Sequence, residues 1–335
     1  MIQFDSVARV RRREFVALLA GGLLAPAFGA RGQSDDRGRI IGVLAPESVP
    51  NRIFVGAFRR RLAELGWAEG RNAQIEVMMS EGEAEALRRA GQSLLARHPD
   101  ILFAYTNLPL ATLVALAPSL PIVFAGIGDP VGNGFVESLA HPGKNVTGFM
   151  SVEPSMGGKW LDILKEVVPG TRRVLVLYDP NTPGNAHYWE PIESAAKRLG
   201  VEPVRGPFSN RDDIAKLLAS FAETPNGAVI SIPSALSIAQ GPVIIFEARY
   251  RKLPSIFGSA TAAEIGGLIG YGPDFEESFR LAAGYVDRVL RGAKPGDLPV
   301  QMPTKFTLAI NHKTAIAIGL SLSESQLARA DEVIE

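Results

Sequence analysis

The feature that most constrains the fold is the alternation, from residue 39 onward, of short β-branched apolar runs with helical patterns. The apolar runs are continuous, which is typical of strands covered by helices on both faces. The first predicted strands are residues 40–45, 75–79, 101–105 and 122–125. The helical patterns between them cover residues 53–65, 83–96 and 108–116. This order predicts a first parallel sheet flanked by helices.

A second alternating set follows further along the chain. Its predicted strands are residues 174–178, 201–204, 228–232, 255–257 and 268–271. Its predicted helices are residues 158–167, 185–199, 211–221 and 238–250. The pattern alone therefore predicts two parallel sheets with helices on both faces, divided once near residue 150. A length of 335 residues agrees with two domains of ~100–200 residues each.

The first 32 residues have the pattern of a secretory signal peptide. Basic residues between Arg9 and Arg13 precede an apolar run over residues 15–28, and a small residue follows at Gly32. A basic region, a short hydrophobic region and small residues predict cleavage within residues 27–32, with the bond after Gly32 preferred. Arg12 and Arg13 also match a twin-arginine motif, so an ordinary secretory route and a twin-arginine route both stay open.

The composition excludes several classes of site and partner. The chain has no Cys, which excludes disulfides, zinc knuckles, iron–sulfur clusters and a lipidated cysteine anchor. Lys and Arg together number 35 and Asp and Glu together number 35, so no basic excess indicates a nucleic-acid partner. An exported chain without a cysteine anchor fits a compartment closed by an outer membrane. We therefore expect the mature protein in the periplasm.

Catalytic and metal motifs are absent from the sequence. Its four His residues show no metal-ligand spacing. Residues 126–131 begin like a dinucleotide-binding loop, but Val131 stands at the third glycine position and Pro130 lacks the N–H that a phosphate needs. There is no Gly-x-Ser-x-Gly elbow and no Gly-Lys-Ser/Thr phosphate loop. The sequence therefore predicts a protein that is not an enzyme and holds no cofactor or metal.

Polar and aromatic residues cluster where predicted strands end. In parallel sheets this edge binds ligands, because helix N-termini there expose unpaired N–H groups. The candidate ligand contacts are Glu47, Ser48, Tyr105, Thr106, Asn107, Asp129, Asp179, Asn181, Ser234, Phe257 and Tyr271. Thr106, Asp129 and Asp179 can equally be helix caps or turn formers, and both interpretations stay open. Their shared position at the sheet edges favours ligand binding.

Several ordered stretches carry a family resemblance. They are residues 58–72, 122–131, 141–148, 266–273, 282–306 and 327–335. In these stretches the chain resembles the periplasmic substrate-binding proteins of ABC transporters, in the tryptophan/tyrosine-type group. The resemblance covers nearly all of the predicted mature chain.

The resemblance implies an α/β fold of two Rossmann-like lobes, the type I periplasmic-binding-protein architecture, with three interlobe crossings. The crossings are expected near residues 150–153, 272–274 and 303–305. The first lobe then comprises residues 33–150 plus 274–304, and the second comprises residues 151–273 plus 305–335. This organisation replaces the single division that the pattern alone suggests.

The departures from the family lie in loops expected to contact ligand. Ser151 and Ser234 stand where, in our alignment, amino-acid-binding members carry acids that would hold an ammonium group. Residues 105–108 replace a Gly-Thr-Pro-Ala-like turn. Tyr105, Phe257 and Tyr271 near the ends of their strands predict a ligand with an apolar or aromatic body and one polar or carboxylate end. Because Ser151 and Ser234 are not acidic, we expect a carboxylate or amide compound without a free ammonium group to bind at least as well as an amino acid. If an ammonium partner exists, the candidates are Glu47, Asp129, Glu153 and Asp179.

The resemblance implies the solute-binding component of an ABC importer. A small molecule, amino-acid-like or aromatic and carboxylate-bearing, would close the two lobes, and a membrane permease with its ATPase subunits would receive it. The protein would be a monomer whose only membrane contact is through the permease. The main alternative is a periplasmic ligand sensor for a membrane receptor. A sugar-responsive DNA-binding regulator would need a helix pair at the N-terminus, where the signal peptide stands.

Overall fold

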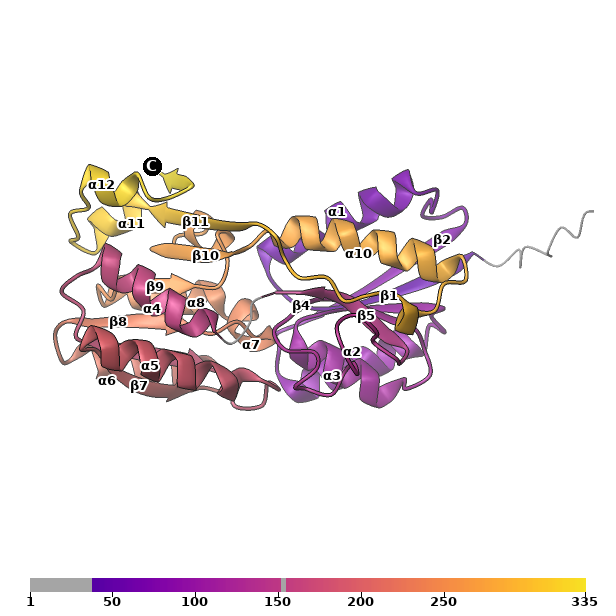
Figure 1. Cartoon of the computed structure of the whole chain (residues 1–335), viewed down its shortest axis with the longest axis horizontal. Coiled ribbons are helices and arrows are strands. Elements are labelled where there is room, and N and C mark those ends of the chain that lie inside the picture. The colour runs from indigo at the N-terminus through magenta and orange to yellow at the C-terminus, as the bar shows by residue number, and fades with distance from the viewer. Residues whose placement is uncertain (1–37, 152–154) are drawn as a thin grey trace, which may run out of the picture. The chain divides into compact units, whose positions relative to one another are not determined.

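The structure is a computed structural model that describes residues 38–151 and 155–335, so the predicted signal peptide and Glu153 lie outside the described residues. Its first sheet has five parallel strands in the order β2-β1-β3-β4-β5 (Figure 1). Their bounds are β1 (Arg39–Pro46), β2 (Ala73–Ser80), β3 (Ile101–Tyr105), β4 (Ile122–Ile127) and β5 (Val146–Met150). With helices α1 (Val49–Glu64), α2 (Ala84–Leu95), α3 (Asn107–Leu116) and α10 (Phe275–Leu290), this sheet forms the first lobe.

The second lobe is built on a seven-stranded sheet in the order β12-β11-β10-β9-β8-β6-β7. Its strands are β6 (Arg173–Tyr178), β7 (Glu202–Pro207), β8 (Gly227–Ser231), β9 (Ser255–Phe257), β10 (Ile269–Pro273), β11 (Phe306–Asn311) and β12 (Glu332–Ile334). Its longer helices are α4 (Met156–Val167), α5 (Trp189–Leu199), α6 (Arg211–Ala222) and α8 (Gly241–Tyr250). Its shorter helices are η1 (Asn185–Tyr188), α7 (Ala235–Ala239), α9 (Thr261–Glu264), α11 (His312–Ala317) and α12 (Glu324–Leu327).

The second sheet is mixed, and this corrects the prediction of two parallel sheets. Strands β10 and β11 pair antiparallel, with Pro273 opposite Phe306. The cause is the path of the chain, which leaves the second lobe at the end of β10 and returns at the start of β11. Since both points lie at the lobe boundary, β11 must run back along β10. The predicted fold class of two α/β lobes joined by three crossings is confirmed.

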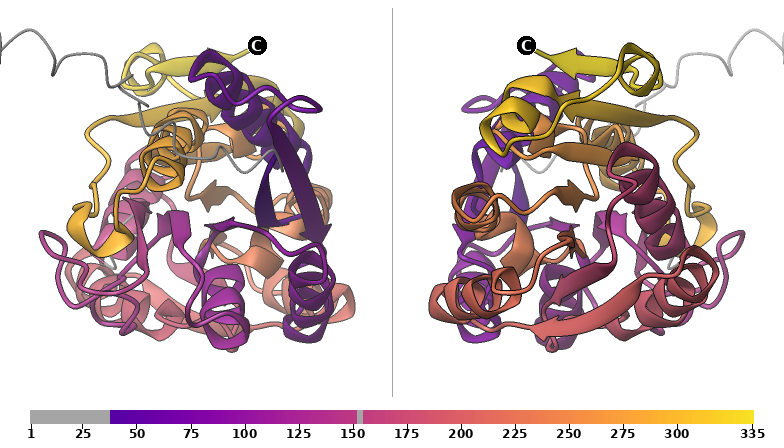
Figure 2. Two further views of the ribbon diagram at one scale, coloured as in Figure 1. Left: turned by 90° about the vertical axis from the view of Figure 1, so that its right-hand side faces the viewer. Right: turned by 90° about the vertical axis from the view of Figure 1, so that its left-hand side faces the viewer.

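Helix α10 belongs to the first lobe although it follows β10 in the chain. It lies beside α1 in Figures 1 and 2, and its Phe279 is fully buried. The Phe279 ring lies 4.9 Å from both the Phe103 and the Tyr105 rings. The Trp67 indole N–H donates to Asp287 of α10 at 2.8 Å. This packing covers one face of the first sheet and ties the late segment to strand β3.

Two predicted helices differ locally from the structure, for reasons of capping and proline chemistry. Helix α1 begins at Val49, before the predicted residue 53, because the Ser48 hydroxyl accepts from the Asn51 N–H and Pro50 suits the first turn. The predicted helix over residues 238–250 is instead split into α7 and α8. Pro242 lies at the start of α8, where it lacks an N–H and cannot continue a preceding helix.

The buried cores explain why the predicted strands are continuous apolar runs. Every residue of β3 is buried, and its side chains alternate between two hydrophobic clusters on opposite faces of the sheet. Across residues 38–151 and 155–335, no helix is both long enough and apolar enough to cross a bilayer.

Candidate functional site

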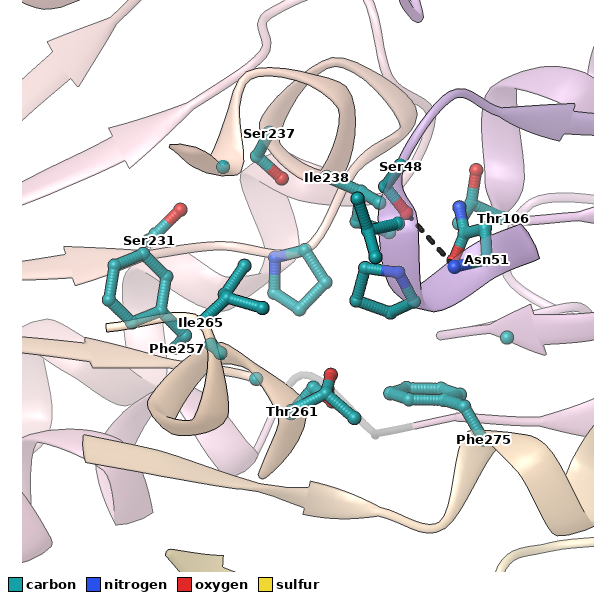
Figure 3. Close-up of a pocket in the computed structure, with 18 of the residues that line it drawn as sticks. Ser48, Asn51, Thr106, Ser231, Ser237, Ile238, Phe257, Thr261, Ile265 and Phe275 are labelled. Atoms are coloured by element: carbon teal, nitrogen blue, oxygen red, sulfur yellow. Dashed lines mark hydrogen bonds between the residues drawn. The ribbon is translucent and has the colours of Figure 1, made fainter. Parts of the chain in front are cut away.

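A cavity of about 230 Å³ lies where strands of both sheets end (Figure 3). From the first lobe it is lined by the residues that follow β1 and β3, including Ser48 and Thr106. From the second lobe it is lined by Ser231 at the end of β8 and Phe257 at the end of β9. Both sheets therefore direct their carboxyl edges to one site, the position at which parallel α/β sheets bind ligands.

Apolar side chains from both lobes form most of the wall. Phe54 of α1 comes from the first lobe. Figure 3 shows Phe275 of α10, also from the first lobe, with Ile238 and Phe257 from the second. The Tyr105 ring is held edge-on at 5.7 Å from Phe275. Burial raises the pKa of the Tyr105 hydroxyl, so this group is protonated and neutral at physiological pH. The cavity can enclose an apolar or aromatic body.

Several polar groups at the wall already have partners that fix their positions. The Ser48 hydroxyl accepts from the Asn51 N–H at 3.1 Å, and the Asn51 side-chain amide donates to the Pro46 carbonyl at 2.7 Å. On the second lobe the Ser237 hydroxyl donates to the Ile232 carbonyl at 2.8 Å. These bonds order the starts of α1 and α7 against the cavity.

Thr106 is a polar wall residue whose buried hydroxyl has no partner among the described residues. It is 4% exposed, and its Oγ1 atom is buried with no hydrogen-bond partner among the described residues. Its φ of 74° is unfavourable for a β-branched residue, and it makes no side-chain cap to α3. An unpaired buried hydroxyl costs about 1–3 kcal/mol, and such backbone strain costs about 1–3 kcal/mol. Backbone strain and an unpaired buried hydroxyl therefore coincide at one residue of the cavity wall.

Helix N-termini from three elements meet the cavity. The first residues of α1 and α8 line it, and Thr106 precedes α3. No acidic residue occupies the first turn of α1, α3 or α8. Each of these N-termini therefore presents the positive end of its helix dipole without an acidic side chain in its own first turn. The Asn51 N–H of α1 is already bonded to the Ser48 hydroxyl, and Pro50 and Pro242 have no N–H.

The two lobes touch directly beside the cavity. Ala235 of α7 is fully buried and packs in the hydrophobic cluster of the first lobe. Gly82 of the first lobe has a φ of +88°, and a Cβ built there would lie 2.5 Å from the Ala235 carbonyl carbon and oxygen and the Leu236 nitrogen. The Asn107 side-chain amide donates to the Pro183 carbonyl of the second lobe at 2.6 Å. These contacts hold the lobes together over the cavity.

Comparison with known proteins identifies the family. The family model described as ABC transporter substrate binding protein matches residues 41–334. The chain belongs to this family. The predicted family is thereby confirmed, and with it the general function, the solute-binding component of an ABC transporter. Proteins of this family bind their solutes in the periplasm or outside the cell.

Relatives and solved structures agree with this assignment. The Tyrosine-binding protein of Clostridioides difficile strain R20291 is 23% identical over 282 residues, which cover 82% of this chain and 80% of the relative. A conserved domain protein from Vibrio cholerae has a TM-score of 0.81 at 24% identity and covers 88% of this chain and 99% of its own. An ABC domain from Streptococcus pneumonia in complex with L-Trp has a TM-score of 0.80 at 23% identity, covering 89% and 100%. These structural likenesses support the two-lobed fold.

Five of the residues predicted from sequence line the cavity of this substrate-binding protein. They are Ser48, Tyr105, Thr106, Ser151 and Phe257. Thr106 is the N-cap residue of α3, but its side chain makes no capping hydrogen bond there. Whether these five contact ligand stays a prediction.

The other predicted residues of the first lobe lie outside the cavity wall. The Glu47 carboxylate pairs on the surface with Arg52 at 2.7 Å. The Asn107 side chain spans the lobes, accepting from the Gly128 N–H at 3.3 Å as well as donating to Pro183. The Asp129 carboxylate accepts from the Gly132 N–H at 2.8 Å. Their polar groups are used within loops and between lobes.

The same holds in the second lobe. The Asp179 carboxylate accepts from the Thr182 hydroxyl at 2.7 Å and from the Asn181 N–H at 2.9 Å, so all three residues form one local turn. The Ser234 hydroxyl caps α7. The Tyr271 ring packs against Phe306 at 5.9 Å. Asp179 and Asn181 serve a local turn, Ser234 caps a helix, and Tyr271 packs against another ring.

The sequence reasoning also missed residues that line the cavity. The predicted helix start at residue 53 is too late, so Asn51 falls before that helix and Phe54 in its first turn. A Ser48 cap followed by Pro50 predicts a helix that begins at Val49. That earlier start would place Asn51 and Phe54 at the sheet edge. Phe275 and Thr261 follow β10 and β9, and the four-residue helix that begins at Thr261 has no helical pattern in the sequence.

Proposed function

We propose that this substrate-binding protein captures one small organic molecule between its lobes in the periplasm and delivers it, unchanged, to a membrane permease. The observation that carries the proposal is the cavity built jointly by both lobes, with Thr106 Oγ1 buried and unpaired at its wall. The names of the tyrosine-binding and L-Trp-bound relatives support an amino-acid-like or aromatic ligand. The permease would be coupled to cytoplasmic ATPase subunits.

In the proposed mechanism the two lobes close on each other by hinge motion at the three interlobe crossings. We take residues 33–150 plus 274–304 as one body and residues 151–273 plus 305–335 as the other, acting as a monomer. Ligand docks on one lobe, and the second lobe then replaces its water with fixed hydrogen-bonding groups. To convert a mostly open protein to a mostly closed one, the ligand must favour the closed form by about 5 kcal/mol. The permease would recognise the closed form.

Native mass spectrometry of freshly purified protein tests the proposal. We expect one small molecule per chain, released by partial unfolding, and a smaller radius of gyration by X-ray scattering when that molecule is restored. The Thr112→Val variant is expected to bind and close like the unaltered protein, because the Thr112 hydroxyl bonds only within α3 and lies off the cavity wall. A protein whose radius of gyration stays constant through a broad ligand screen would contradict the proposal.

Export is expected to remove the signal peptide. We expect N-terminal sequencing of protein released by osmotic shock to begin between Phe28 and Gln33, because the basic and apolar regions precede small residues there. Replacing Arg12 and Arg13 with Lys separates the two routes, since twin-arginine export would fail and ordinary secretion would continue. A chain that keeps Met1 and stays in the cytoplasm would refute the periplasmic placement.

A further inference from the structure

We infer that the cavity selects an apolar organic acid, a compound with one carboxylate, a compact hydrocarbon or aromatic body and no ammonium group. The inference rests on the proposed function and names the chemical class of its ligand. It is carried by three features of the cavity: the helix N-termini, the unpaired Thr106 hydroxyl and the uncharged wall.

The helix N-termini give the cavity a positive electrostatic character. Residues 49–51 at the start of α1 and residues 241–242 at the start of α8 line it, and α3 begins directly after Thr106. These helices span 16, 10 and 10 residues, and none has an acid in its first turn. The start of α10 differs, because Asp274 caps it and Glu276 and Glu277 occupy its first turn. The positive ends of these three helix dipoles favour a bound anion and disfavour a bound cation.

Thr106 supplies the second, independent observation. Thr106 lines the cavity (Figure 3), its hydroxyl oxygen is buried without a partner among the described residues, and its φ is 74°. A hydroxyl can donate to a carboxylate oxygen. The first N–H groups of α3 lie beside it and, like those of any helix, have no acceptor within the helix. Together they form a docking point for a carboxylate.

The described residues of the wall offer hydroxyl and amide oxygens but no carboxylate to an ammonium group. Among the described residues that line the cavity none is charged, and the polar ones are serine, threonine, asparagine and tyrosine. The neighbouring Glu47 is already paired with Arg52 at the surface. Burial of a cation without a counter-charge is strongly unfavourable. A cavity of about 230 Å³, below the usual ~300–1,000 Å³ of drug-sized pockets, suits a compact body such as one ring.

A matched set of compounds on one body tests the charge preference. We expect isothermal calorimetry with the purified protein to find 3-phenylpropanoate bound at least tenfold more tightly than phenylalanine, and phenethylamine not bound. The neutral 3-phenylpropanamide is expected to bind between the acid and the amine. The set 4-methylpentanoate, leucine and 3-methylbutylamine repeats the comparison on an aliphatic body.

The Thr106 docking point has its own matched variants. Thr106→Val keeps the shape and removes the hydroxyl, and we expect it to weaken binding of the acid about tenfold while changing binding of the amide less. Thr106→Ser restores the hydroxyl and is expected to recover most of the affinity. Thr112→Val on the same helix, with its hydroxyl bonded to the Leu108 carbonyl at 2.8 Å, controls for general damage to α3.

The outcomes separate this inference from the proposed function. Tighter binding of either amino acid or either amine than of its acid overturns the inference, while lobe closure by that compound would sustain the proposed function. Failure of both acids to bind also overturns it. If no compound of any charge binds or closes the lobes, the proposed function fails as well.

Discussion

Replacing Gly82 with valine is expected to abolish ligand capture while both lobes stay folded. A Cβ at this position would lie 2.5 Å from backbone atoms of Ala235 and Leu236, and backbone cannot move aside as a flexible side chain can. Since α7 packs into the core of the first lobe, the clash is relieved only when the lobes separate. We expect at least ~100-fold weaker binding of the co-purified ligand, equivalent to about 2.7 kcal/mol.

The matched control is Gly70→Val. Gly70 has a φ of +80°, close to the +88° of Gly82, but no heavy atom of the described structure beyond its own neighbours lies within 4 Å of a Cβ there. Both variants carry the same backbone strain, about 1–2 kcal/mol, and only Gly82→Val blocks the contact between lobes. Calorimetry and X-ray scattering would show the difference. Equal affinities for the two variants would mean that the Gly82 contact with α7 has no part in capture.

Replacing Phe279 with alanine is expected to remove about 3–5 kcal/mol from the free energy of unfolding, the usual cost of deleting a buried aromatic ring. The Phe279 ring is fully buried and contacts the rings of Phe54, Phe103 and Tyr105 at 4.9 to 5.6 Å. Urea denaturation would measure the loss. Hydrogen exchange is expected to show it first in β3, because the cavity left by the ring opens against that strand.

Leu281→Ala is the control on the same helix. Leu281 is 43% exposed, so its truncation deletes fewer buried atoms and is expected to cost less than about 1 kcal/mol. A similar loss for both variants would show that α10 is stabilised by helix formation alone. Unchanged exchange in β3 for Phe279→Ala would contradict the assignment of α10 to the core of the first lobe.

The lobes could be predicted from sequence because strands covered on both faces have a distinctive pattern. A strand such as β3, buried along its whole length, needs an unbroken apolar run, and the run is visible without knowledge of its neighbours. The order of pairing is not visible in this way. The antiparallel return of β11 depends on where the chain leaves and re-enters the second lobe, which no local periodicity records.

The candidate site was only partly predictable, again for a physical reason. Polar residues after strands serve local turns as readily as ligands, and Asp129 and Asp179 are both satisfied by neighbouring N–H groups. Thr106 differs in that nothing nearby satisfies it, and that distinction needs coordinates. The apolar wall residues Phe54 and Phe275 had no sequence signal that separates them from the core.

The placement of α10 also affects how the protein is made. The first lobe exposes Phe54 of α1 and Phe103 of β3 until residues 275–290 have been synthesised and have packed against them. A growing chain therefore holds an incomplete first lobe through most of its translation. Truncation before α10 leaves an aggregation-prone fragment, and neither lobe can be transplanted to another protein as one continuous piece of the gene.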